Sequence, residues 1–246
     1  MSRRTIPKTV LFRVLLRSFL LQASWNFEQL QNLGALYVLK PALCFLYRGD
    51  ELTQACRRHF QYFNTHPFLA SPIFGVTLAL EDDPGGDFDA REFKEMVAAP
   101  YAAMGDSFFW GGIRPLAVCL ALFFAVRGSL FAVAIFLVLF NLPHLWFRTA
   151  GLLRGYSFGL QSIEKIQGLR LPDLALRLKE ITVILLGGLC AYLTFLTLRT
   201  EYVAIGWGVL VLPVVVLLGW LVSRRVSVLL LALSMAAIVL AVQQVV

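Results

Sequence analysis

A segment near the amino terminus carries one carboxylate and two amides at helical spacing. On a helix, Glu28, Gln31 and Asn32 lie at positions i, i+3 and i+4 and therefore share a face. Such groups can bind the hydroxyls of a sugar, and an aromatic side chain such as Trp25 can lie against a sugar ring. The same groups could instead join helices through hydrogen bonds. The sequence leaves both roles open.

A second group of polar side chains follows an expected helix end. Pro67 disfavours helical backbone at His66, so we expect a helix to stop near Asn64. Unwound backbone there would let Asn64 and Thr65 face a cavity. His59 and His66 could titrate near neutral pH or bind a metal, but a metal site needs three or four converging ligands. The sequence shows no such set, so we expect no metal and a structural role for His59.

A third group comes just before an apolar region. Asp106 and Trp110 lie in segment 105–115, where a carboxylate is costly unless it is paired or faces water. Asp106 could accept hydrogen bonds from a hydroxylated ligand or pair with Arg114. A serine hydrolase built around Ser107 is disfavoured, because the chain has neither a G-x-S-x-G elbow nor an α/β pattern to carry one.

The composition predicts an integral membrane protein. The 246 residues are 59% hydrophobic and 15% charged, whereas an average soluble domain is about 45–50% apolar and about 25% charged. The net charge of +7 is explained by basic residues beside apolar spans, not by nucleic-acid binding. The chain has no P-loop, no dinucleotide-binding glycine pattern and no kinase motif. We therefore expect no cofactor and no ATP hydrolysis.

Three apolar runs at the carboxyl terminus can each cross a bilayer as a helix. They cover residues 181–198, 202–223 and 226–246, with very short links between them. A hydrocarbon core of about 30 Å needs roughly 20 helical residues. Basic residues precede the first run and also lie between the second and third runs. They predict that these two segments are cytoplasmic, which places the carboxyl terminus outside.

Two other segments are expected to be helical without simply spanning the bilayer. Residues 1–24 fit an amphipathic helix in the cytoplasmic interface, with Arg13 and Arg17 on one face. Residues 113–147 fit a broken hairpin, because its first apolar arm, 115–126, has too few residues to span. This predicts a re-entrant element of the kind at which transporters place substrates.

Together these segments predict an all-α integral membrane protein in three parts. They are an amphipathic helix over 1–24, a polar helical core with re-entrant elements over 25–180, and a three-pass transmembrane unit over 181–246. Within the core, Gly151-x-x-x-Gly155-x-x-x-Gly159 predicts closely packed helices. The acid-rich residues 81–95 predict a solvated linker followed by a short helix.

Several blocks of rare residue types, in order along the chain, resemble the IID membrane component of the mannose/fructose/sorbose family of the bacterial sugar phosphotransferase system. The resemblance runs from about residue 10 to the carboxyl terminus, and its matched blocks make it specific. These blocks are 24–34, 63–67, 71–81, 105–110, 114–115 and 155–159.

The resemblance implies a subunit of a sugar permease in the bacterial inner membrane. A IID component pairs with a IIC membrane subunit in a hetero-oligomer that conducts a hexose-type sugar, while cytoplasmic IIA and IIB phosphocarriers supply the phosphate. IID is not itself phosphorylated, so neither a phosphohistidine nor independent enzyme activity is expected. The residues then expected to line or support the sugar path are Glu28, Gln31, Asn32, Asn64, Thr65, Asp106 and Trp110.

The sequence departs from the family pattern at three places. Ala99 and Ala103 stand where glycines are usual, residues 91–95 replace a small-residue segment, and a hydrophilic insertion between two carboxyl-terminal spans is reduced to 199–201. Alanine restricts backbone that glycine leaves free. The alternative function is therefore a divergent regulatory or scaffolding subunit of the same complex, which binds IIC without passing sugar.

Overall fold

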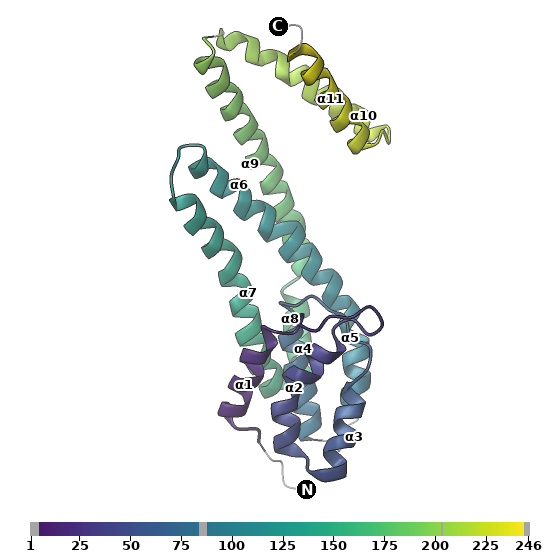
Figure 1. Ribbon diagram of the computed structural model, residues 1–246. Helices are drawn as coiled ribbons and strands as arrows, with labels where there is room; N and C mark the ends of the chain where they lie inside the picture. Colours follow the sequence, from purple (N-terminus) through teal and green to yellow (C-terminus); the bar gives the residue numbers. More distant parts are fainter. Residues whose placement is uncertain (1–4, 84–87, 203, 244–246) are drawn as a thin grey trace. The chain divides into compact units, whose positions relative to one another are not determined.

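The structure is a computed structural model that describes residues 5–83, 88–202 and 204–243. Within this part of the chain every regular element is helical (Figure 1). The elements are α1 (Lys8–Ser18), α2 (Asn32–Leu46), α3 (Gly49–His59), α4 (Ala70–Asp82), α5 (Ala90–Gly105), the π-helical segment η1 (Asp106–Ile113), α6 (Arg114–Ala125), α7 (Phe131–Phe158), α8 (Gln161–Gly168), α9 (Leu171–Thr200), the 3-10 segment η2 (Ile205–Leu210), α10 (Val211–Ser223) and α11 (Val228–Gln243).

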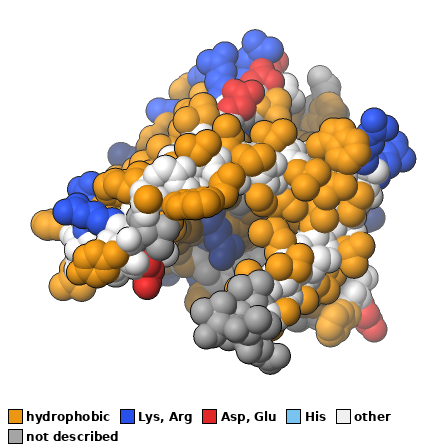
Figure 2. Space-filling view, turned by 90° about the horizontal axis from the view of Figure 1, so that it is seen from above, with side chains coloured by type: hydrophobic (Ala, Val, Ile, Leu, Met, Phe, Trp, Pro, Cys, Tyr) orange, Lys and Arg blue, Asp and Glu red, His pale blue; other side chains and the backbone are white. Residues whose placement is uncertain are grey.

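Four helical stretches are long and apolar enough to cross a membrane. They are Ala90–Ala125, Phe131–Phe158, Gln161–Thr200 and Ile205–Ser223. Figure 2 shows hydrophobic side chains over most of the face seen in that view, as expected of helices that lie in lipid. The predicted all-α membrane class is confirmed, and helices occupy all three apolar runs predicted at the carboxyl terminus.

The chain divides into two compact units, residues 1–186 and 187–246. The boundary falls inside α9, six residues after the predicted start of the three-pass unit. The first unit holds α1 to α8 and the beginning of α9, and it contains every residue proposed above for the sugar path. The division into three functional parts stays a prediction.

A helical hairpin of α6 and α7 turns at Gly128, whose φ of +69° favours glycine. The length predicted for its first arm was wrong. The helix continues back through η1 and α5, so that Ala90–Ala125 forms one stretch of 36 residues. Charged residues such as Arg114 end an apolar run without ending a helix. A re-entrant element is therefore not required by the length of this arm.

Glycines let α4 and α7 pack with their backbones in contact. A Cβ on Gly75 would overlap backbone atoms of α7, and a Cβ on Gly155 would lie 2.7 Å from the carbonyl oxygen of Pro72. Gly151 lies against the ring of Pro72 in the same way. The predicted close packing is confirmed for these two glycines of the motif, and it occurs within one chain. Gly159 instead ends α7, with a φ of +53°.

The amino-terminal helix α1 is shorter than the predicted 1–24, of which residues 1–4 lie outside the described part. It packs on α2 and α7 and buries Leu11 and Val14. Phe12 and Leu16 point outward and are more than half exposed. One apolar face of α1 is thus buried against α2 and α7, and a second apolar face is exposed. Its location in the membrane interface stays a prediction.

The acid-rich region is only partly the expected linker. Glu81 and Asp82 complete α4 and are buried, because their partners lie in other helices. Residues 84–87 lie outside the described part. The predicted short helix is present as α5, and the carboxylate of Asp89 caps it by accepting hydrogen bonds from the backbone amides of residues 91 and 92.

Candidate functional site

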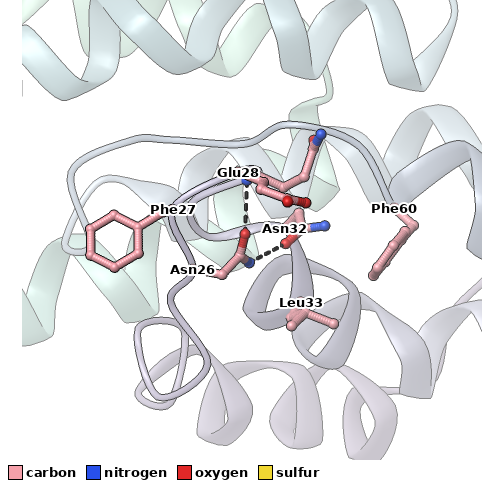
Figure 3. Close-up of a pocket in the computed structure, with 7 residues that line it drawn as sticks. Asn26, Phe27, Glu28, Asn32, Leu33 and Phe60 are labelled. Carbon is pink, nitrogen blue, oxygen red and sulfur yellow. Dashed lines mark hydrogen bonds between the residues drawn. The ribbon is translucent and has the colours of Figure 1, made fainter.

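The backbone just before α2 forms a turn that the side chain of Asn26 holds. Its Oδ1 accepts a hydrogen bond from the backbone of Gln29 at 2.8 Å, and its Nδ2 donates to Asn32 Oδ1 at 2.9 Å (Figure 3). Asparagine stabilises such turns at the expense of a helix. The predicted helical face shared by Glu28, Gln31 and Asn32 is therefore wrong, since only the last of them is helical.

This turn and the residue after α3 border a cavity of about 500 Å³. Glu28, Asn32 and Phe60 lie around it, whereas the ring of Phe27 points away (Figure 3). Two of the predicted site residues, a carboxylate and an amide, are thus brought together beside an aromatic ring. The complete lining is Asn26, Phe27, Glu28, Gln29, Asn32, Leu33 and Phe60.

A buried clamp ties this cavity to the segment after α3. Gln31 Nε2 donates to the carbonyl oxygen of Thr65 at 2.9 Å, and Gln31 Oε1 accepts from the amide of Thr65 at 3.1 Å. The backbone amide of Gln31 also donates to Phe63 at 2.8 Å. Both ends of the Gln31 side chain are occupied, so Gln31 and Thr65 position the site. Asn64 lies between the two contacts and is half-buried.

The segment that follows α3 is unwound, as predicted, although α3 already ends at His59. Thr65 and His66 are both buried there, and Pro67 leads into the turn before α4. The predicted helix end near Asn64 was five residues too late. Extended backbone around Phe63, which pairs with Leu30 as an isolated bridge, replaces the last expected turn of helix.

A second polar group lies on the π-helical segment η1. The side chain of Asp106 is 64% exposed, and its Oδ1 lies 4.0 Å from His66 Nε2. The ring centroid of Trp110 lies 5.1 Å from that of His66. Arg114, the predicted alternative partner of Asp106, lies over the Trp110 ring at 5.7 Å. The candidate site therefore has two parts, joined by the segment from Phe63 to His66.

Glu81 forms an ionic cluster that the sequence did not suggest. Its carboxylate accepts two hydrogen bonds from Arg58, at 2.7 and 3.1 Å, one from the Tyr47 hydroxyl at 2.7 Å, and lies 2.9 Å from His59 Nε2. Burial alone would raise the pKa of Glu81, but the hydrogen bonds from His59 and Arg58 outweigh burial and lower the pKa to about 2.

Lys94 extends this cluster into the interior. It is fully buried, and its Nζ lies 3.2 Å from the backbone oxygen of His59 and 3.4 Å from His59 Nδ1. Lys94 belongs to the segment 91–95, in which the sequence is expected to depart from the family pattern. No sequence signal could have joined these groups, because Glu81 is 22 residues from His59 and Lys94 is 35 residues from it.

We expect stability to fall as pH drops through the titration of His66. Burial, followed by the positive charge of Arg148, lowers its pKa from 6.5 to about 4. Between pH 6.5 and 4 the unfolded state therefore binds a proton that the folded state does not, which removes on the order of 3 kcal/mol. Thermal unfolding of His66→Phe in detergent should depend less on pH over this window than wild type. Equal pH dependence of the two would contradict this assignment.

The fold and the candidate site define an all-helical integral membrane protein with a cavity bordered by Glu28, Asn32 and Phe60 and a polar group on a π-helical turn. The chain belongs to the IID components of the mannose/fructose/sorbose family of the phosphotransferase system. The family model described as "PTS system mannose/fructose/sorbose family IID component" matches residues 5–246. The resemblance seen in the sequence is thereby confirmed.

Individual relatives agree with this membership. The "PTS system mannose-specific EIID component" of Escherichia coli K12 is 42% identical over 162 residues, which are 63% of this chain and 57% of that protein's length. The "Fructose permease IID component" of Bacillus subtilis strain 168 is 33% identical over 194 residues, 76% of this chain and 70% of that protein. The matched region thus spans little more than half of the Escherichia coli relative.

Two solved structures are similar to the present one over nearly all of the chain. A chain described as "Structure of membrane protein" has a TM-score of 0.71 at 30% identity and covers 97% of both chains. A chain from "CryoEM Structure of Mannose Transporter ManYZ and Microcin E492 (MceA) complex" has a TM-score of 0.60 at 30% identity and covers 96% of both.

Proposed function

We propose that this chain is the IID subunit of a sugar phosphotransferase permease. It forms the path for a hexose-type sugar together with a IIC membrane subunit, and cytoplasmic IIA and IIB phosphocarriers phosphorylate the sugar as it enters. Family membership and the mannose and fructose named for its relatives support this proposal. The observation that carries it is the cavity in which Glu28 and Asn32 lie together beside Phe60.

The groups around this cavity suit a polyhydroxylated ligand. The Glu28 carboxylate can accept hydrogen bonds from two sugar hydroxyls, and Asn32 Nδ2 can donate one, since its Oδ1 already accepts from Asn26. The half-exposed ring of Phe60 offers an apolar face for the C–H side of a sugar. The IIC subunit would cover the open side of the cavity and exclude bulk water.

The proposed location is the bacterial inner membrane, with several membrane-spanning helices. Arg224 and Arg225 connect α10 to α11, and further basic residues precede the apolar part of α9. By the positive-inside rule both sets lie in the cytoplasm. The amino terminus is then cytoplasmic and the carboxyl terminus lies outside.

The alternative, a regulatory or scaffolding subunit, draws its support from Ala99 and Ala103. Both residues lie within α5, where alanine is the most favourable helix former. Alanine at these two positions therefore imposes no strain on α5. The transport function remains the proposal. Normal assembly with IIC but no sugar-dependent phosphate transfer would identify the alternative instead.

We expect Glu28→Ala and Asp106→Ala each to lower sugar uptake at least about tenfold, because each removes a carboxylate that accepts from sugar hydroxyls. Uptake of radiolabelled D-mannose, D-fructose and L-sorbose is measured in cells that lack their own IID subunit and carry the partner subunits. Glu164→Ala, which removes an exposed carboxylate from α8, is the control. Unchanged uptake in both variants would contradict the proposed roles of Glu28 and Asp106 in sugar binding.

A further inference from the structure

The imidazole of His66 has one satisfied and one unsatisfied nitrogen. Its Nδ1 accepts a hydrogen bond from the backbone amide of Phe68 at 3.2 Å. A nitrogen that accepts carries no proton, so the proton of the neutral ring is on Nε2. Nε2 is buried and has no hydrogen-bond partner among the described residues. His66 therefore presents a buried N–H donor that no described residue accepts from.

The surroundings hold this ring in one orientation. It stacks on Phe109, with centroids 5.1 Å apart and the planes 11° from parallel, and it meets the edge of Phe68 at 5.0 Å. Gly105 lies so close to the imidazole that any side chain there would overlap it. Burial and the Arg148 guanidinium lower the pKa of His66 to about 4, so the ring is neutral at physiological pH.

The separation between His66 Nε2 and the carboxylate of Asp106 fits one bridging oxygen atom. Asp106 Oδ1 lies 4.0 Å from Nε2, whereas a direct hydrogen bond needs about 2.7–3.2 Å. An oxygen about 2.8 Å from both atoms spans this separation, with roughly 90° between its two hydrogen bonds. We propose that His66 and Asp106 together bind one hydroxyl group of the transported sugar, which accepts from Nε2–H and donates to the carboxylate.

The pair selects a hydroxyl over an ion, because it consists of one donor and one negatively charged acceptor. A cation would meet the Nε2–H proton, and an anion would be repelled by Asp106. A group that both donates and accepts satisfies the two sides at once. This inference rests on the proposed function. It adds His66 as a residue that contributes to specificity by binding one hydroxyl of the sugar.

Trp110 is an aromatic neighbour of this position. It lies on η1 with Asp106, its ring is 5.1 Å from His66, and its side chain is 38% exposed. Because Nε2 itself is buried, binding of a sugar hydroxyl there requires a neighbouring side chain to move, and Trp110 is the partly exposed one among the aromatic neighbours of His66 on η1. π-Helical segments such as η1 are rare, and those that occur frequently lie at functional sites. The indole face then lies beside the sugar ring whose hydroxyl occupies the pair.

The test compares monodeoxy sugars on wild-type and variant complexes assembled with IIC. D-Mannose, D-fructose and L-sorbose are screened first, and the monodeoxy series of whichever binds is then titrated. We expect one analogue to bind wild type about tenfold more weakly than the parent sugar. In His66→Phe, which keeps the stacked ring, that difference should fall below twofold, and His66→Gln, which restores a donor, should recover part of it.

Asp106→Ala is the second variant, because its exposed side chain can be removed without disturbing packing. It should abolish the penalty for the same analogue. Equal penalties in wild type and both variants would overturn this inference alone, since they would mean that the pair holds only water or has a structural role. Failure of the wild-type complex to bind any of the three sugars would overturn the proposed function, and the inference with it.

Discussion

Glu81→Ala is expected to destabilise the protein by about 3–5 kcal/mol, the usual cost of breaking a buried ion pair. The side chain of Glu81 is 3% exposed and pairs with Arg58 at 2.7 Å. Without it, the Arg58 guanidinium, the Tyr47 hydroxyl and His59 Nε2 all lose the acceptor they share. The penalty is large because His59 and Glu81 are buried, whereas Arg58, with 31% of its side chain exposed, keeps part of its contact with water.

Thermal unfolding in detergent would measure this loss. Glu51→Ala removes an exposed carboxylate from the first turn of α3 and should change stability by less than about 0.5 kcal/mol. The depressed pKa of Glu81 adds a second readout. Its stabilising effect is complete above about pH 4.5 and is lost as the pH falls towards 2. A Glu81→Ala protein as stable as the Glu51→Ala control would refute the role of the cluster.

Gly155→Leu is expected to disturb the packing of α4 on α7 and to cost about 3 kcal/mol, the upper end of the usual range for overpacking. A Cβ at this position would lie 2.7 Å from the backbone oxygen of Pro72 and 3.1 Å from Gly75 Cα. Both neighbours are backbone atoms, so relief requires the two helices to separate. Since α4 carries Glu81 at its end, separation would also open the ionic cluster.

Gly187→Leu supplies the matched control, because no atom of the described residues lies within 4 Å of the position a Cβ would take there. The yield of monodisperse protein on size exclusion and the unfolding temperature report the difference. Gly187→Leu should resemble wild type in both measurements. If Gly155→Leu matched it, the close approach of α4 and α7 would not limit stability.

The membrane class and the helix packing could be predicted from the sequence because they follow from composition and regular spacing. Long apolar runs need no tertiary information, and Gly151 and Gly155 repeat at one turn of a helix. The apolar pattern underestimates the hairpin arm because Arg114 interrupts the apolar run. A helix continues wherever its backbone hydrogen bonds continue, whatever the charge of the side chain.

The site was harder to predict, because its residues depend on contacts distant in sequence. Helical spacing placed Glu28 and Gln31 on one face, but the hydrogen bonds of Asn26 fold that segment into a turn. Glu81 lies in an acid-rich stretch that is typical of a linker. Its pairing with Arg58 becomes visible only when the fold brings the two residues together. The unpaired nitrogen of His66 becomes evident only once the amide of Phe68 is placed.

The π-helical turn has a consequence for how this stretch can vary in length. In a π-helix the hydrogen bonds join residues five apart, so η1 holds an extra residue compared with an α-helical turn over the same distance. Loss of one residue from Asp106–Ile113 would therefore let the segment become α-helical while α5 and α6 stay continuous. The side chains of Phe109 and Trp110 would change position against His66, so a chain shortened here is expected to lose the aromatic surroundings of the imidazole while it keeps the helix.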